Sequence, residues 1–192
     1  MKITNVRVYG LDDSFKASKY PMAIDTKECT SEYTDRIKQL GSARIGSGHD
    51  NFMNGIIVQF DLTFSQKAWV ELQRYHFIDF VSSQSTMHRI DRFDLDNQFN
   101  RWVDDRVKDV LKELVKAYQE EKTHENFLKV IYNIPSGFEL TARMTTNYRQ
   151  LKTIYHQRKN HRLIEWRGFC KWIESLPCMK DFLGVSNGKE ED

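Results

Sequence analysis

Side chains that can bind an anion are concentrated between Glu71 and Arg89. The cationic or titratable members lie within sixteen residues: Arg74, His76, His88 and Arg89. Short hydroxyl and amide side chains stand among them: Ser82, Ser83, Gln84, Ser85 and Thr86. Fixed cations supply charge, and hydroxyl and backbone N–H groups supply direction, so the segment is suited to holding an anion. The alternative interpretation is an amphipathic helix that ends in a polar, solvated loop.

A second cationic segment covers residues 147–162. On a regular helix of about 100° per residue, one face carries Asn147, Leu151, Ile154 and Arg158. Another face carries Arg149, Thr153 and His156. Arg149 and Arg158 therefore point in roughly opposite directions, and one ligand cannot easily contact both from a single chain. Two ligands, or a site shared between subunits, can use both arginines. The alternative is a helix with a solvated basic face.

The composition is that of an ordinary globular protein. Of 192 residues, 40% are hydrophobic, 12% aromatic and 29% charged, and no shift in composition divides the chain. We therefore expect a single domain over 1–183 and a disordered tail over 184–192. A formal net charge of +2 is too small to indicate a nucleic-acid-binding protein. The chain has no long apolar run and no signal peptide, which predicts a cytoplasmic protein without a membrane segment.

The cysteines give no sign of a metal centre. Cys29, Cys170 and Cys178 lack the spacing of metal ligands, and three is an odd number for disulfides. We therefore expect reduced thiols and no metal site.

Alternating hydrophobic patterns predict strands at 2–9, 56–64 and 138–144. Helices are predicted over 32–40 (capped by Ser31 and stopped by Gly41), 66–77 (capped by Ser65), 104–122, 123–132 (started by Thr123), 146–158 and 162–175. Residues 10–27 show no period and are predicted to be a loop. Because strands and helices are mixed without regular βαβ alternation, the sequence predicts an α+β fold with an antiparallel sheet covered by helices.

Taken together, the two cationic segments resemble those of the flavin-dependent thymidylate synthases. That family has a segment of the form RHRxxSxNExSxRY about twenty-five residues after a Gly-His, and a later helix NxR…R…H…E that follows a Leu-Pro turn. Here Gly48-His49 precedes Arg74-Tyr75-His76 by the same interval, and Ser85 lies one residue from the motif serine. Ile134-Pro135 matches the turn. The later helix is matched by Asn147, Arg149, Arg158, His161 and Glu165, with one residue missing before His161.

The resemblance spans about residues 45–170 and implies a specific activity. It implies an α+β homotetramer with active sites between subunits, which methylates dUMP to dTMP with FAD, NADPH and methylenetetrahydrofolate. The implied flavin contacts are His49, Arg74, His76, Asn147, Arg149, Thr153 and His161, where Thr153 replaces a family asparagine. The implied nucleotide contacts are Arg74, Ser82, Gln84, Ser85, Arg89 and Arg158. In this scheme Arg158 holds and polarises the uracil ring. No side-chain nucleophile is required if flavin hydride activates dUMP.

The chain departs from the family motif at several cationic positions. Tyr75-His76 replaces His-Arg, Val81-Ser82 replaces Asn-Glu, and Met87-His88 replaces Arg-Tyr, with Arg89 one or two positions late. Ile131 stands where the family keeps an arginine, four residues before the proline of the turn. Cations expected around the dUMP phosphate are therefore missing or moved, although His76, His88 and Arg89 can replace them locally.

Two other functions remain open from the sequence. One is a non-catalytic protein on the same fold that binds nucleotide or flavin, which the altered RHR motif favours. The other is a nucleic-acid-binding module that uses the basic helix over 148–167, which the small net charge disfavours.

Overall fold

The computed structural model describes residues 1–185. Its strands are β1 (Lys2–Tyr9), β2 (Ile57–Ser65), β3 (Ile78–Ser83) and β4 (Glu139–Asn147). Its α-helices are α1 (Leu11–Ala17), α2 (Asp35–Ser42), α3 (Gln66–Leu72), α4 (Thr86–Arg89), α5 (Asp105–Glu120), α6 (His124–Tyr132), α7 (Tyr148–Arg158), α8 (Ile164–Glu174) and α9 (Met179–Leu183). Of the tail predicted to be disordered, 186–192 lie outside the described residues. The backbone N–H groups of Gly184 and Val185 donate to carbonyl oxygens of α9.

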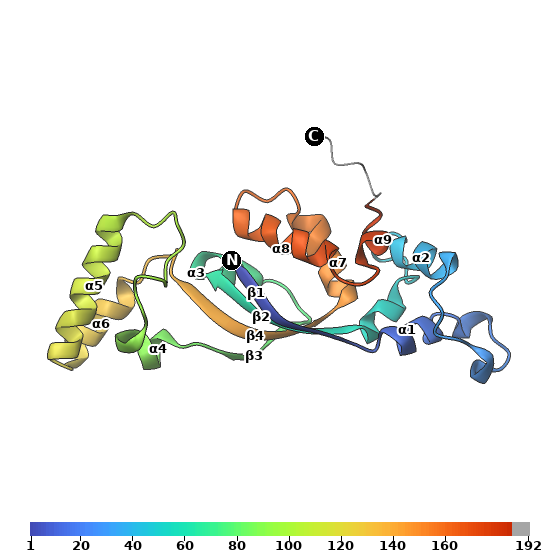
Figure 1. Ribbon diagram of the computed structural model, residues 1–192, viewed down its shortest axis with the longest axis horizontal. Helices are drawn as coiled ribbons and strands as arrows, with labels where there is room; N and C mark the ends of the chain where they lie inside the picture. The colour runs from blue at the N-terminus through green and yellow to red at the C-terminus, as the bar shows by residue number, and fades with distance from the viewer. Residues whose placement is uncertain (186–192) are drawn as a thin grey trace. The chain divides into compact units, whose positions relative to one another are not determined.

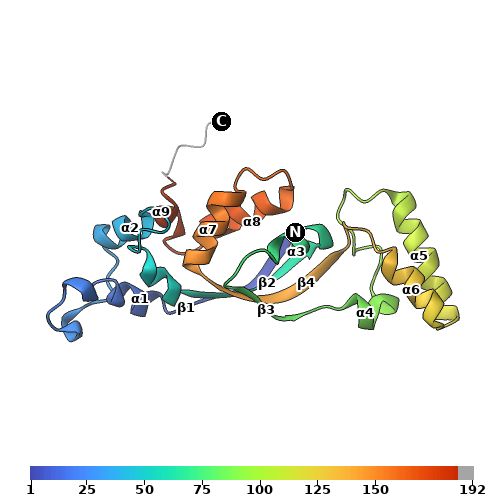
Figure 2. The ribbon, with the colours of Figure 1, turned by 180° about the vertical axis from the view of Figure 1, so that it is seen from behind.

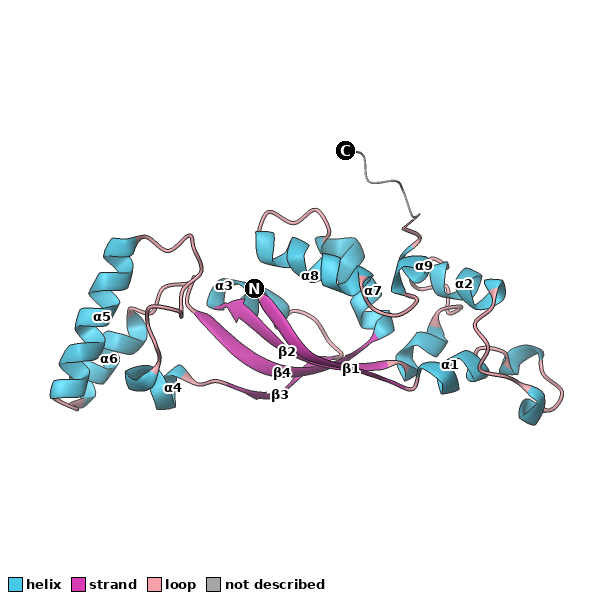
Figure 3. Cartoon of the chain, viewed as in Figure 1, coloured by secondary structure: helices cyan, strands magenta, loops and turns pink. Residues whose placement is uncertain are grey.

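The four strands form one antiparallel sheet in the order β1-β2-β4-β3 (Figure 3). This arrangement of sheet and helices confirms the predicted α+β class. The alternation that predicts β2 corresponds to a buried face, because its alternate apolar side chains are fully buried: Val58, Phe60, Leu62 and Phe64. The three strands predicted from alternation correspond to β1, β2 and β4, whereas β3 was not predicted.

The chain divides into two compact units, and every strand has residues in both. The first unit comprises Met1–Thr4, Asp61–Tyr75 and Phe80–Met144. The second unit comprises Asn5–Phe60, His76–Asp79 and the described residues from Thr145 onward. We describe each unit separately.

In the first unit, α5 and α6 lie side by side and enclose an apolar core (Figure 1). The core residues are Ile90, Leu111, Val115, Val130 and Phe138. Thr123 caps α6 as predicted, accepting the Asn126 N–H at 3.2 Å. Of the apolar side chains of α5, Leu111 and Val115 are buried, whereas Val107 and Val110 are exposed.

Also in the first unit, α3 begins as predicted but ends early. Ser65 Oγ accepts the Ala68 N–H at 3.3 Å, and the Trp69 indole N–H donates to the Leu140 carbonyl at 3.1 Å. The prediction that the helix continues to Phe77 is wrong, since α3 ends at Leu72. Phe77 has a φ of 60°, a left-handed conformation that cannot continue a helix. His76, which like Phe77 belongs to the second unit, is exposed.

The polar segment after α3 is exposed along most of β3, but it is not simply a loop, because it contains β3 and α4. Where β3 ends in the first unit, the Gln84 N–H donates to the Thr141 carbonyl at 3.0 Å. The Gln84 side-chain oxygen accepts the Thr141 N–H at 2.8 Å and so extends the pairing with β4. β3 is an edge strand with one buried residue, Ile78, so its alternation is weak and pairing with a strand distant in sequence creates it.

In the second unit, aromatic packing joins α8 to β2. The Phe60 ring centroid lies 6.0 Å from that of Phe169 and 4.5 Å from that of Trp172. α7 packs beside α8, and α2 beside α9 (Figure 2). α9, which has no sequence signal, packs Phe182 against Tyr33 and Phe52 at centroid distances of 6.1 and 5.7 Å.

Residues 10–27 are not a loop as predicted, since they contain α1 and two 3₁₀ turns (Tyr20–Met22 and Thr26–Glu28). Gly10 precedes α1 with a φ of 72°, and a Cβ there would lie 2.5 Å from the Gly55 carbonyl oxygen. Phe15 is 3% exposed because the rings of Tyr33, Phe52 and Phe182 surround it. With seven residues, α1 is too short to show a clear helical periodicity in the sequence, and this aromatic packing stabilises it.

The predicted ends of the next helix are also wrong. Thr34, not Ser31, caps α2 by accepting the Ile37 N–H at 3.4 Å. Gly41 does not stop the helix but lies inside it. A Cβ on Gly41 would lie 2.2 Å from the Phe182 ring, so a glycine is needed for α9 to pack this closely.

Candidate functional site

A pocket of about 390 Å³ lies at the start of α7 in the second unit. It is lined by Ile45, Gly46, Asn54, Phe77, Asn147, Arg149, Gln150 and Thr153. Three residues of the predicted flavin set therefore meet here: Asn147, Arg149 and Thr153.

The direct passage from β4 into α7 fixes these three side chains. Asn147 is the last residue of β4 and the cap of α7, and its side-chain oxygen accepts the Gln150 N–H at 2.8 Å. Arg149 and Thr153 are four residues apart and share one helix face. The Thr153 hydroxyl donates to the Arg149 carbonyl at 3.1 Å. The cap thus fixes where the helix begins, and the helical repeat sets Arg149 beside Thr153.

Phe77 is a pocket residue that the sequence reasoning missed. Its backbone is left-handed, with a φ of 60°, and its side chain is 71% exposed. The Thr146 hydroxyl donates to the Phe77 carbonyl at 2.7 Å and holds this strained backbone in place. An exposed aromatic ring on the wall of a pocket can stack on a planar ligand. No sequence signal identifies a left-handed phenylalanine.

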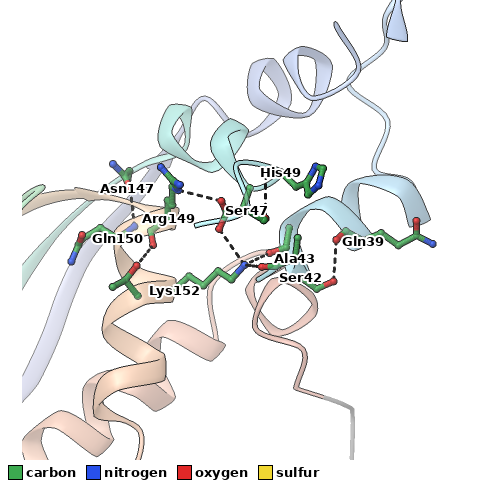
Figure 4. Close-up of polar contacts among 12 residues, drawn as sticks. Gln39, Ser42, Ala43, Ser47, His49, Asn147, Arg149, Gln150 and Lys152 are labelled. Atoms are coloured by element: carbon green, nitrogen blue, oxygen red, sulfur yellow. Dashed lines mark hydrogen bonds and ion pairs between the residues drawn. The ribbon is translucent and has the colours of Figure 1, made fainter. Parts of the chain in front are cut away.

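Beside the pocket, a buried carboxylate joins two cations (Figure 4). Asp50 Oδ1 accepts from Arg149 Nε at 3.2 Å, and Asp50 Oδ2 lies 3.3 Å from Lys152 Nζ. Burial lowers the pKa of Lys152, an effect that Asp50 opposes and Arg149 reinforces. Asp50 and Lys152 were not predicted as site residues. Lys152 lies within a run of cations that gives no hint of which one is buried.

The predicted histidines His49 and His76 do not line this pocket. Both side chains are exposed. The His49 backbone N–H donates to the Ser47 hydroxyl at 3.4 Å within the turn that follows α2 (Figure 4). Of this turn, Ile45 and Gly46 line the pocket.

Arg158 lies at the other end of α7 in a cluster of its own. Its guanidinium contacts His161 Nε2 at 2.7 Å and lies 4.7 Å from the centroid of the Trp166 ring. The Leu163 N–H donates to His161 Nδ1 at 3.2 Å. Arg158 and His161, two predicted site residues, are therefore brought together. Trp166 is fully buried and was missed, because a helical tryptophan is most often simple core.

The first unit has a pocket of about 400 Å³ between α3 and the strands. It is lined by Gln66, Trp69, Val70, Gln73, Phe80, Ser83, Gln84, Leu140, Thr141 and Ala142. Of the nucleotide residues predicted, Gln84 lines this pocket, whereas Ser82, Ser85, Arg74 and Arg89 do not. None of the lining residues carries a charge, so the pocket walls suit a neutral ring better than a phosphate.

Within residues 1–185, no group of three or more His, Cys, Asp or Glu side chains is arranged to hold a metal ion. Among the same residues, no helix has the length and apolarity needed to cross a membrane.

Comparisons with known proteins bear on the fold. No protein-family model matches the chain, and no curated protein does. Two crystal structures of the flavin-dependent thymidylate synthase ThyX from Helicobacter pylori, each with FAD and dUMP, are similar to it. Each is 16% identical, with a TM-score of 0.74 over 95% of this chain and 97% of the other. The chain therefore has the fold of the flavin-dependent thymidylate synthases.

Proposed function

We propose that this chain is a divergent FAD-dependent thymidylate synthase, which converts dUMP to dTMP with methylenetetrahydrofolate and NADPH. The observation that carries the proposal is the pocket that joins Asn147, Arg149 and Thr153. The fold supports it, since both similar structures hold FAD and dUMP. We also propose a cytoplasmic homotetramer with sites at subunit interfaces.

The residues of the pocket at the start of α7 suit a flavin. Arg149 offers cationic N–H groups, Asn147 and Gln150 are amides, and Phe77 offers an aromatic surface. The volume lies within the range of cofactor sites, roughly 300–1,000 Å³. When bound and reduced by NADPH, FAD would supply the hydride for the reaction. We assign the remaining flavin contacts to His49, Arg74, His76 and His161.

We assign the pyrimidine ring to Arg158. His161 and Trp166 hold its guanidinium, so its donors are oriented before a ligand binds. Donors placed where negative charge develops on the ring would polarise it. We assign the rest of the nucleotide to Ser82, Gln84 and Ser85. Arg74 and Arg89, which lie on either side of these residues in the sequence, are the cations that we assign to the nucleotide with them.

The second candidate function is a non-catalytic protein that binds flavin or a nucleotide on the same fold. Ile131 favours it, because this residue packs against the apolar core of the first unit at the position where the resemblance implies an arginine. The uncharged walls of the first-unit pocket favour it as well.

Absorbance between 350 and 500 nm tests both candidates on the purified protein, as isolated and after FAD is added. For the thymidylate synthase we expect a bound-flavin spectrum that NADPH bleaches and that returns when dUMP and methylenetetrahydrofolate are added, with dTMP detected by chromatography. Bound flavin without turnover would support the non-catalytic candidate. A protein that never takes up FAD would contradict the assignment of a flavin site.

A further inference from the structure

Behind Arg149, the second unit buries a lysine and an aspartate to which the proposed function gives no part. Asp50 is 0% and Lys152 2% exposed. Lys152 Nζ donates to the carbonyl oxygens of Gly41 at 2.7 Å and Ala43 at 2.6 Å, and to Asp50 at 3.3 Å (Figure 4). An ammonium has three N–H groups, so every donor of Lys152 has an acceptor. Two of these acceptors are carbonyls at the end of α2, which a cation stabilises.

The charges in this cluster do not cancel. One carboxylate, Asp50, stands between two cations, so the formal charge of the three side chains is positive. The two carboxylate oxygens are divided between the cations: Oδ1 faces Arg149 Nε and Oδ2 faces Lys152 Nζ. The Arg149 side chain is 31% exposed and lines the pocket, whereas Asp50 and Lys152 are buried. The excess positive charge is therefore presented by Arg149.

We propose that Lys152 is a charge-sharing residue. It binds one of the two carboxylate oxygens of Asp50, so Asp50 does not fully neutralise Arg149, and Arg149 can bind an anionic group in the pocket. This inference rests on the proposed function and deepens it, since it takes the anionic group to be the diphosphate of FAD. Lys152 does not contact the ligand and is a positioning residue. Its effect is electrostatic and acts through Asp50, because a carboxylate bound to a single guanidinium neutralises it.

Three variants separate charge sharing from a merely structural role. Lys152→Met leaves Asp50 to Arg149 alone, so the affinity for FAD should fall about tenfold. Asp50→Asn keeps an oxygen acceptor for Arg149 Nε but removes the negative charge, so FAD should bind as tightly as in the wild type or more tightly. The double variant, Asp50→Asn with Lys152→Met, has no carboxylate to neutralise Arg149, and it should recover the affinity that Lys152→Met loses.

The probes are FAD and riboflavin, each titrated by flavin fluorescence. Riboflavin has the same ring but no diphosphate, so charge sharing predicts that its affinity is equal in all four proteins. Far-UV circular dichroism and urea unfolding establish which variants fold. If Lys152→Met does not fold, the double variant still tests the proposal, because it leaves no unpaired buried charge and should bind FAD at least as tightly as the wild type.

Weaker FAD binding in all three variants, or a parallel loss of riboflavin, would overturn charge sharing in favour of a structural role. A wild type that binds neither flavin overturns the proposed function instead. Inorganic pyrophosphate, titrated by calorimetry, then tests the inference by itself. Charge sharing is supported if pyrophosphate binds the wild type more tightly than Lys152→Met, or, where Lys152→Met does not fold, if it binds the double variant at least as tightly as the wild type. Equal binding to the wild type and Lys152→Met, weaker binding to the double variant than to the wild type, or no binding at all overturns it.

Discussion

Arg149 and Arg158 stand at opposite ends of α7 and have different neighbours. Nine residues of helix separate their α-carbons by about 13.5 Å along the axis. Asp50 holds Arg149 at the pocket, while His161 and Trp166 hold Arg158. The sequence leaves open whether two ligands, or one site shared between subunits, use the two arginines, and this separation along the helix allows both.

Substituting Arg158 tests its proposed role on the pyrimidine. Arg158→Ala should lower dTMP formation by at least about a hundredfold, the loss typical when a donor to developing charge is removed. Flavin absorbance should be retained, because Arg158 is not among the residues that line the pocket at the start of α7. Arg162→Ala, an exposed arginine nearby in the chain, is the matched control and should keep its turnover. Unchanged turnover in Arg158→Ala would remove Arg158 from the chemistry.

Phe77 combines a strained backbone with a position on the wall of the proposed flavin pocket. A left-handed conformation costs a non-glycine residue about 1–2 kcal/mol, which glycine avoids. Phe77→Gly should therefore be about 1 kcal/mol more stable to urea than Phe77→Ala. Both should bind FAD more weakly than the wild type, because both lack the ring. If flavin affinity were unchanged in both variants, Phe77 would have no part in the site, and the reason for its strained backbone would have to be sought elsewhere.

At the scale of elements, α2 and α9 show a close packing that intrinsic propensity does not reveal. Glycine within a helix costs about 1 kcal/mol relative to alanine, so Gly41→Ala would stabilise an isolated α2. In the folded second unit the new methyl group would meet the Phe182 ring, which is fully buried.

We therefore expect Gly41→Ala to lower the free energy of unfolding by about 1–3 kcal/mol, the usual cost of overpacking. Urea unfolding followed by circular dichroism measures the change. In the background of Phe182→Leu, which leaves more room, the same substitution should cost less. A stabilising Gly41→Ala in the wild-type background would show that α9 is not packed this closely.

At the scale of the whole molecule, the proposed homotetramer makes the separation of the two arginines testable. If sites form between subunits, one site can take Arg149 from one chain and Arg158 from another. Arg149→Ala and Arg158→Ala should each be inactive alone. Mixed, dissociated and reassembled, they should regain part of the activity, because some sites then contain both arginines.

Each variant treated in the same way without the other is the control, and light scattering gives the mass of the assembly. Reassembled tetramers that stay inactive would mean that both arginines of a site come from one chain. A monomer in solution would contradict the proposed assembly itself.

The sequence by itself determined the elements whose signals are local. Alternation predicted β1, β2 and β4, and the caps Ser65 and Thr123 placed the starts of α3 and α6, because a strand period or a cap is written within a few neighbouring residues. The order and spacing of cationic motifs predicted the fold that the structural comparison shows. The resemblance assigned Asn147, Arg149 and Thr153 to one ligand, and the three residues line one pocket.

Only the tertiary structure decided the features that depend on distant parts of the chain. β3 exists because it pairs with β4, and α1 because aromatic rings cover Phe15. A glycine is needed at position 41, inside α2, because Phe182 packs on it. The partnership of Asp50 with Lys152 joins residues 102 positions apart. Burial creates it, since only in the interior must every donor of a lysine find an acceptor, and no pattern of neighbouring residues encodes that requirement.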